Sequence, residues 1–434
     1  MAEGGSAEDG ASQDGPTKDH AAGPVTAAGG QAVARNLRLI PVHEIVSGSL
    51  VWLPILVLFT RARFDLDGAL LLSGIYYLAV VVLEVPSGWM SDRLGRVPTL
   101  RLAAVCWIAA HLCFLVGDDR FWYIAAGQAF LAGGFASLSG TDVTLHYDSL
   151  EALDLAEEYR DRQGRLRSLG LVATATSSVF GGLIGWWLDL RAVFVVSLVL
   201  AIVQFGVTLR LVEPGSTHRA EMFHGQIRSC ISYLADRYLG WIFFYGILMV
   251  TLEHVAFELM QPWLTEVLDR SADEVGATPL LSGAAFAVTS LVGAVAARSA
   301  DPLARRFGAV ATLIGLAGLS AVIVSSMALW VSAPVLVLFA FRSAQGAAAP
   351  VLIGSVVAPR VEQRHRATLL SLNSLAGRLG YGLILLAVSD VAADEVRRVL
   401  GWFSMISWMM VAVLVVTGVV VSRTDGAAAA PIVR

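Results

Sequence analysis

Long runs of apolar residues, separated by short polar stretches, fill most of the chain. A helix needs about 20 such residues to span a bilayer, and runs of that length recur twelve times. The predicted spans are 37–60, 69–90, 98–117, 122–146, 166–188 and 191–212, then 238–262, 279–298, 309–330, 333–357, 368–388 and 397–422. The pattern predicts an all-α membrane protein with twelve transmembrane helices.

The polar residues divide these spans into two equal groups. A polar stretch at 213–237 separates six spans from six, which predicts two pseudo-symmetric six-helix bundles at 37–212 and 238–422, joined by a cytoplasmic linker. Residues 1–36 are rich in Ala and Gly and lack the apolar core of a signal peptide, so we expect a disordered tail. Residues 423–434 form a second predicted tail. Paired bundles of this kind can hold a site near the bilayer midplane between them.

Composition excludes several classes of protein. The 434 residues are 56% hydrophobic and 15% charged, whereas a soluble domain has about 25% charged residues. A net charge of −4 gives no basic surface for nucleic acid. The sequence contains no HExxH, GxSxG, P-loop or Rossmann pattern, so we expect neither enzymatic chemistry nor ATP coupling. We also predict no cofactor and no metal site, and a proton gradient as the energy source.

Basic residues predict the orientation in the membrane. With both termini in the cytoplasm, 22 of the 31 basic residues lie on the cytoplasmic side and seven in the outer loops, as the positive-inside rule requires. Lys18 is the only lysine among them, a usage typical of GC-rich bacterial genomes. We therefore expect a bacterial inner-membrane protein with cytoplasmic termini. Four prolines, Pro54, Pro86, Pro262 and Pro350, are predicted to interrupt helices, which neighbouring helices can tolerate.

The loop between the second and third spans carries the most specific motif. Its defining residues are Gly88, Asp92, Arg93, Gly95 and Arg96, in a GxxxDRxGR pattern. This pattern, together with the twelve spans, resembles the major facilitator superfamily. In that family the loop is a cytoplasmic charge latch that favours the outward-open state, and the resemblance implies the same role here.

The chemistry of the loop suggests partners for its charges. We expect Asp92 to accept hydrogen bonds from backbone amides at a helix N-terminus. Arg93 and Arg96 are expected to pair with carboxylates on adjacent helices, for which Asp148 and Glu151 are candidates. A second copy of the motif at 298–308 keeps charged residues but not the spacing, which leaves a matching C-terminal latch in doubt.

Other stretches resemble motifs of the same family. Arg342, Gln345 and Gly346 in the tenth span are similar to an RxxxG motif that the fourth span lacks. Small residues at 173–182 resemble an antiporter motif only if serines replace Gly and Pro, and helix packing explains them at least as well. The stretches 83–88, 146–150 and 366–378 look like an efflux branch of bacterial facilitators, which implies export of small molecules.

Ionisable and polar residues inside the spans are candidates for proton coupling or substrate binding, because each is costly in lipid unless paired or hydrated. The candidates are Glu44, Glu84, Asp142, His146, Glu253, His254, Glu258, Arg342, Gln345, Asn373 and Arg378. Glu44 and His146 are placed near cytoplasmic ends, where they could reach water. Asp142 and His146 form one i, i+4 pair, for which a packing or latch role is slightly favoured over proton transfer.

The seventh span holds the strongest candidates. His254 and Glu258 are spaced i, i+4 on one helical face, and Glu253 lies deep in the span. Burial disfavours the charged form of Glu253 and a nearby arginine favours it, so this carboxylate is our hypothesis for the coupling proton. A structural ion-pair set with Arg342 or Arg378 is an equally weighted alternative. A divalent cation site is a minor alternative, since no third helix supplies a ligand set.

These observations predict a monomeric secondary transporter that moves a small molecule by alternating access. The predicted activity is proton-coupled export of small amphipathic molecules, with protons and the lipid bilayer as its other partners. One alternative is a proton-coupled uptake permease for a nutrient or metabolite. An alternative of another class is a non-transporting membrane sensor or lipid-handling protein with the same fold.

Overall fold

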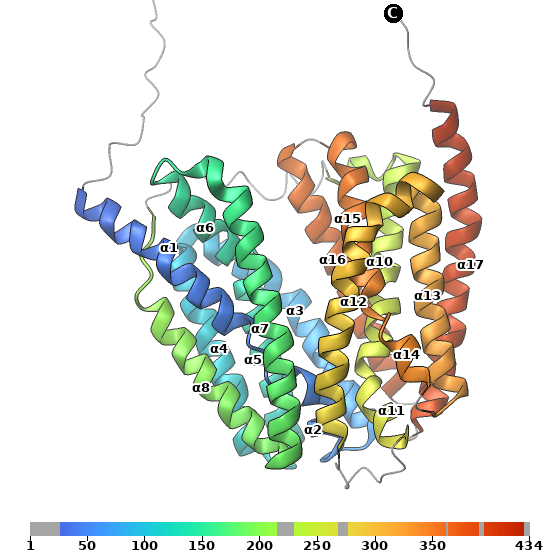
Figure 1. Cartoon of the computed structure of the whole chain (residues 1–434), viewed down its shortest axis with the longest axis horizontal. Helices are drawn as coiled ribbons and strands as arrows, with labels where there is room; N and C mark the ends of the chain where they lie inside the picture. Colours follow the sequence, from blue (N-terminus) through green and yellow to red (C-terminus); the bar gives the residue numbers. More distant parts are fainter. Residues whose placement is uncertain are drawn as a thin grey trace, which may run out of the picture.

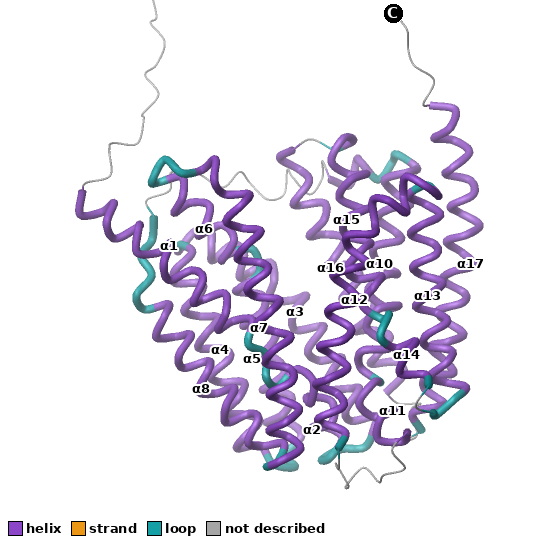
Figure 2. The backbone as a smooth tube through the Cα atoms, in the orientation of Figure 1, coloured by secondary structure: helices purple, strands orange, loops and turns teal. Residues whose placement is uncertain are grey.

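The computed structural model describes residues 27–214, 230–267, 277–332, 334–361, 363–389 and 395–428. All regular elements in these ranges are helices (Figure 2). Twelve helical segments among them are long and apolar enough to cross a membrane. The predicted all-α fold with twelve spans is confirmed.

The first six spans form one group of helices, shown in blue to green in Figure 1. Its elements are α1 (Ala27–Gly48), η1 (Leu53–Ile55), α2 (Leu56–Arg61), α3 (Leu66–Leu94), α4 (Arg96–Gly117), α5 (Phe121–Leu138), α6 (Thr141–Glu151), η2 (Ala156–Glu158), α7 (Tyr159–Trp187) and α8 (Leu190–Thr208). We call this group the N half.

The last six spans form the C half, shown in yellow-green to red in Figure 1. Its elements are α10 (Arg237–Glu258), α11 (Met260–Val267), α12 (Thr278–Phe307), α13 (Ala309–Leu329), α14 (Val335–Phe339), α15 (Ser343–Arg360), α16 (Gln363–Ser389) and α17 (Val396–Ala428). Most of the predicted linker, residues 215–229, lies outside the described ranges.

Two predicted tail boundaries differ from the structure. Helix α1 begins at Ala27, so the part of the predicted tail at 27–36 is helical rather than disordered. The physical reason is burial: Val33 and Asn36 face the protein, and the Asn36 amide is hydrogen-bonded to the start of the linker. At the other end, α17 continues to Ala428, beyond the predicted boundary at 422. Residues 1–26 lie outside the described ranges.

Four spans are broken in mid-course, and they are the first, fourth, seventh and tenth. Their pieces are α1 with η1 and α2, α5 with α6, α10 with α11, and α14 with α15. Proline accounts for only some of these breaks. Pro86 lies inside the unbroken α3 and Pro350 inside α15, contrary to prediction, whereas the break before α6 occurs at Gly140, whose φ of 73° suits a residue without a Cβ.

The two halves meet at the end of the molecule opposite the termini. In Figure 1 they converge toward α2 and α11 and are farther apart where α17 ends. The pairs with the most extensive contacts across the halves are α3 with α16, α7 with α12, η1 with α12, and α2 with α11. One apolar cluster contains Leu66 and Tyr77 of the N half together with Leu259 and Trp263 of the C half. This cluster closes that end, which we call the closed end.

Helices α7 and α12 approach one another closely because their contact is built from small residues. A Cβ atom added at Gly182 of α7 would lie 2.5 Å from the carbonyl oxygen of Pro279 in α12. Gly283 of α12 faces the carbonyl oxygen of Ser178 in the same way. Packing between the halves therefore accounts for the small residues that resemble an antiporter motif.

Candidate functional site

A central cavity of about 770 Å³ lies between the two halves. It is partly open and is lined by α1, α3 and α7 of the N half and by α10, α12 and α16 of the C half, among others. The ionisable side chains on its wall are Glu44, Asp142, Arg167, Glu253, His254, Glu258, Arg342 and Arg378. Its size suits a drug-sized molecule.

Glu258 connects the two halves at the base of this cavity. Its side chain is 5% exposed and accepts a hydrogen bond from Ser73 Oγ at 3.0 Å and one from the Tyr77 hydroxyl at 3.3 Å. Both donors belong to α3, whereas Glu258 is the last residue of α10. The sequence indicated Glu258 but not these partners, which lie more than 180 residues away along the chain.

His254 lies one helical turn before Glu258 and contacts the same tyrosine. Its ring packs edge-on against Tyr77, with ring centroids 5.4 Å apart, so the two residues share a face as their i, i+4 spacing predicts. The Nδ1 atom of His254 lies 2.7 Å from the Val250 carbonyl oxygen of its own helix. His254 therefore has one ring nitrogen committed to α10 and faces the junction between the halves.

Glu253 and Arg342 lie on facing helices of the C half. The carboxylate of Glu253 rests against Gly346 of α15, one turn beyond Arg342. Arg342 is 7% exposed, and its guanidinium carbon lies 5.2 Å from the ring centroids of both Phe257 and Phe286. Within the described residues no hydrogen bond reaches its Nε atom. The two charges are neighbours but do not form an ion pair there.

Arg378 and Glu84 form an ion pair across the halves. The Nη1 atom of Arg378 in α16 donates to Glu84 Oε2 in α3 at 3.0 Å. Both side chains are partly exposed, and Arg378 reaches the cavity wall. The alternative of a structural ion pair therefore applies to Arg378, but its partner is Glu84 of the second span rather than a residue of the seventh.

Two acidic residues line the cavity on the N-half side. The sequence predicts Glu44 near the end of its span, but the first span runs from Gly30 to Arg61, which places Glu44 near its middle and on the cavity wall. Asp142, in the first turn of α6, lines the same wall. His146 is buried instead of reaching water, with its Nδ1 atom 2.7 Å from Gln163 Oε1. Asp142 and His146 therefore have different surroundings: Asp142 lines the cavity, whereas His146 contacts Gln163.

Two candidates lie outside the cavity wall and connect helices of the C half. Asn373 donates from Nδ2 to the Phe243 carbonyl oxygen at 2.5 Å, which joins α16 to α10. Gln345 accepts from Ser320 Oγ at 2.7 Å and donates to the Tyr245 hydroxyl at 3.1 Å. These bonds satisfy buried polar groups between helices.

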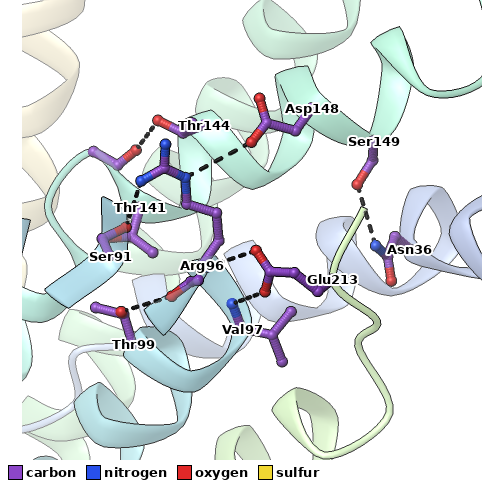
Figure 3. Close-up of polar contacts among 12 residues, drawn as sticks. Asn36, Ser91, Arg96, Val97, Thr99, Thr141, Thr144, Asp148, Ser149 and Glu213 are labelled. Carbon is purple, nitrogen blue, oxygen red and sulfur yellow. Dashed lines mark hydrogen bonds and ion pairs between the residues drawn. The ribbon is translucent and has the colours of Figure 1, made fainter. Parts of the chain in front are cut away.

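A second polar cluster lies at the loop between α3 and α4 (Figure 3). The Nε atom of Arg96 lies 3.7 Å from Asp148 Oδ2 of α6, which confirms Asp148 as its partner. Arg96 also donates to Ser91 Oγ at 2.9 Å, and Thr141 donates to the same hydroxyl at 3.2 Å. The loop is thereby joined to α6. The side chain of Asp92 lies outside the described residues.

Glu213 occupies the helix N-terminus that we expected Asp92 to occupy. Its two carboxylate oxygens accept hydrogen bonds from the backbone N–H groups of Arg96 and Val97, each at 2.8 Å (Figure 3). A carboxylate there is stabilised by the positive end of the helix dipole. Gly95 has a φ of 107°, and a Cβ atom on it would lie 2.8 Å from Glu213 Cδ. Both facts require glycine at this position.

Asn36 holds the start of the linker beside this loop. The side chain is fully buried, donates to the Val212 carbonyl oxygen at 2.7 Å and accepts from the Val212 N–H at 3.0 Å. It also donates to Ser149 Oγ of α6 at 3.1 Å (Figure 3). Sequence reasoning missed Asn36 and Glu213, since both lie in segments predicted to be a tail and a linker.

The remaining residues of the motif have the following surroundings. Arg93 lies over the ring of Trp89, with its guanidinium carbon 5.6 Å from the ring centroid. Gly88 is exposed, with open space around it. In the C half, Gly308 follows α12 with a φ of 85°, so the backbone turn of the motif recurs. The charged residues are kept with a different spacing, and Asp301 pairs with Arg305 of its own helix at 2.6 Å.

Comparison with known families identifies this architecture. The family model described as Major Facilitator Superfamily matches residues 45–385, most of the chain. The chain belongs to the major facilitator superfamily. With its twelve apolar helices, this superfamily member is a multi-pass membrane protein.

Relatives and solved structures agree with this assignment. The inner membrane transport protein YajR of Escherichia coli (strain K12) is 25% identical over 193 residues, which are 43% of this chain and 40% of that relative. The match thus covers less than half of the relative's length. The structure of a point mutant of the nucleoside transporter NupG superposes on this chain with a TM-score of 0.71, at 12% sequence identity. The superposition covers 89% of this chain and 99% of the NupG chain. A POT family transporter in complex with 5-aminolevulinic acid gives 0.66 at 11% identity, with 89% and 96% covered. At these identities the structures establish the fold alone.

Proposed function

We propose that this protein exports small amphipathic molecules in exchange for protons, by alternating access to the central cavity. The observation that carries the proposal is Glu258, a buried carboxylate that both lines the cavity and bonds to the opposite half. A proton that binds at such a position acts on the substrate site and on the contact between the halves at once.

The surroundings of Glu258 support a role in proton coupling. The polar groups around it are Ser73, Tyr76 and Tyr77 from α3, Tyr381 from α16, and His254 one turn earlier on its own helix. None is a permanent cation, and burial of an unpaired carboxylate is costly. Protonation removes that cost while the halves are closed around Glu258. When the closed end opens, water reaches the carboxylate and supports its charged form.

The proposal replaces Glu253 with Glu258 as the carrier of the coupling proton. Glu253 contacts α15, which moves with it in the C half, whereas the bonds of Glu258 must break when the halves separate. We therefore assign the coupling proton to Glu258 and give Glu253 a part in substrate binding. Glu253→Gln remains informative, because the original hypothesis predicts a loss of proton-driven transport with substrate binding preserved.

Orientation and direction complete the proposal. With the termini in a bacterial cytoplasm, the closed end faces outward and the cavity opens inward. Export, rather than uptake, is supported by the resemblance of residues 83–88 and 146–150 to an efflux branch. In this account the protein works as a monomer and the loop cluster around Arg96 acts as a cytoplasmic latch.

Everted membrane vesicles test the proposal. An acid interior should drive accumulation of fluorescent amphipaths, drawn from a panel that includes cations, neutral molecules and zwitterions, and a protonophore should abolish it. Glu258→Gln should abolish the gradient-driven part, whereas the exposed loop variant Glu395→Gln should not. Accumulation driven by the opposite gradient would establish uptake instead. Vesicles without any gradient-dependent flux would support the non-transporting alternative.

A further inference from the structure

Arg342 is the buried arginine of the cavity wall. Three arginines line the cavity: Arg167 is exposed, Arg378 is paired with Glu84, and Arg342 is 93% buried. Within the described residues, the Arg342 side chain forms neither a hydrogen bond nor an ion pair, and its Nε atom is buried without a partner, although a guanidinium has five donors. A buried charge of this kind is costly unless something pairs with it. Because Arg342 lines the cavity, a ligand bound there can supply the opposite charge.

The surroundings of Arg342 define what that partner is. The guanidinium carbon lies 5.2 Å from the ring centroids of Phe257 and Phe286, which line the cavity themselves, and 5.7 Å from that of Phe339. Apolar rings thus surround this cation on the cavity wall. Arg342 also lies at the N-cap position of α15, an 18-residue helix that begins within a membrane span. The planar donor fork and the positive helix end both select a carboxylate or a similar oxyanion. The rings select an apolar body next to it.

Glu253 supplies the opposite charge one helical turn away. Its carboxylate lies against Gly346 on the same helix as Arg342, and both side chains line the cavity. The two do not pair with each other within the described residues. A ligand with separate anionic and cationic groups can therefore satisfy both, whereas a ligand with one charge leaves the other side chain unpaired.

We propose that the substrate is an amphoteric molecule whose carboxylate binds Arg342, whose ammonium binds Glu253 and whose apolar body packs on Phe257 and Phe286. This assignment rests on the proposed function for its direction of transport, but not for the binding site itself. Glu258 lies five residues beyond Glu253, about 7.5 Å along the helix. The proposed ammonium site and the proposed proton site therefore lie close together on α10.

A matched set of three ligands tests the proposal by calorimetry on purified protein in detergent. The set is 3-(2-naphthyl)alanine, 3-(2-naphthyl)propanoate, which lacks the amine, and 2-(2-naphthyl)ethylamine, which lacks the carboxylate. We expect the zwitterion to bind at least about tenfold more tightly than either singly charged analogue, because each omitted group leaves a buried charge unpaired. An analogue that binds as tightly as the zwitterion, or no binding of the zwitterion at millimolar concentration, overturns the proposal.

Variants assign each group to its side chain. Arg342→Met should reduce zwitterion affinity to that of the amine, and Glu253→Gln should reduce it to that of the acid. Arg342→Lys keeps the charge and guards against misfolding, and it should retain part of the affinity. The exposed control Arg398→Met should bind as the unmodified protein does. Equal loss for the acid and the amine in Arg342→Met overturns the assignment. Since binding needs no gradient, these results stand apart from the vesicle assay: proton-driven flux without zwitterion selectivity refutes the site and leaves the proposed function standing.

Discussion

Replacement of Asn36 by alanine tests whether the first helix is fastened to the linker and to α6. The substitution removes three hydrogen bonds: two to the backbone of Val212 and one to Ser149 Oγ. The side chain is fully buried. Water therefore replaces poorly the hydrogen bonds that the Val212 backbone and the Ser149 hydroxyl lose. At about 1 kcal/mol for each bond, the free energy of unfolding should fall by about 2–3 kcal/mol.

A double-mutant cycle separates this network from a general packing effect. Ser149→Ala removes one of the three bonds and should cost about 1 kcal/mol or less. The double variant should cost less than the sum of the two, because both single changes break the same bond. Unfolding by denaturant, followed by tryptophan fluorescence in detergent, gives the three values. An Asn36→Ala protein within about 0.5 kcal/mol of the unmodified protein would refute the reasoning, since that is the range of ordinary surface changes.

Three further predictions concern the contact between the halves and the orientation of the chain. Gly182→Leu should overpack the junction of α7 and α12 and cost about 1–3 kcal/mol of unfolding free energy; an unchanged denaturation midpoint would contradict that close approach. Arg378→Met should cost about 1 kcal/mol, because its ion pair with Glu84 is partly exposed, and the double variant with Glu84→Gln should recover most of that loss. A cysteine introduced at the exposed position Leu94 should resist an impermeant thiol reagent in intact cells, whereas one at the exposed position Trp122 should react; the reverse pattern would mean that the termini face outward.

The spans could be predicted from the sequence because crossing a bilayer imposes length and hydrophobicity on each helix separately. The breaks within spans could not, because they depend on neighbours. Pro86 is accommodated inside α3, whereas Gly140, which no proline accompanies, begins a new helix. A glycine in an apolar run looks the same in the sequence whether it lets two helices pack closely or ends a helix. The sequence alone therefore does not distinguish the two roles.

The candidate site was predictable where its residues share a helix and not where they meet across the fold. The i, i+4 spacing placed His254 and Glu258 on one face, and both contact Tyr77. The partner of Arg378 lies 294 residues away along the chain, and no local pattern indicates such a pair. Asn36 was missed for a related reason. A single asparagine in a segment that looks polar does not indicate that its side chain will hydrogen-bond to a backbone far away along the chain.

The most direct test of the account asks whether the proton on Glu258 sets the arrangement of the halves. Spin labels at the exposed ends of α3 and α12, Leu94→Cys and Phe307→Cys, report their separation on the side of the termini, in a background without the three native cysteines. At low pH the neutral Glu258 favours the closed-end contact, so the labels should lie far apart. At high pH the charged carboxylate disfavours burial, and the distance should shorten.

Glu258→Gln should keep the long distance at both pH values, because glutamine resembles the protonated acid, whereas the control Glu395→Gln should respond to pH as the unmodified protein does. A distance distribution that ignores pH in the unmodified protein, or one that still follows pH in Glu258→Gln, would contradict the account.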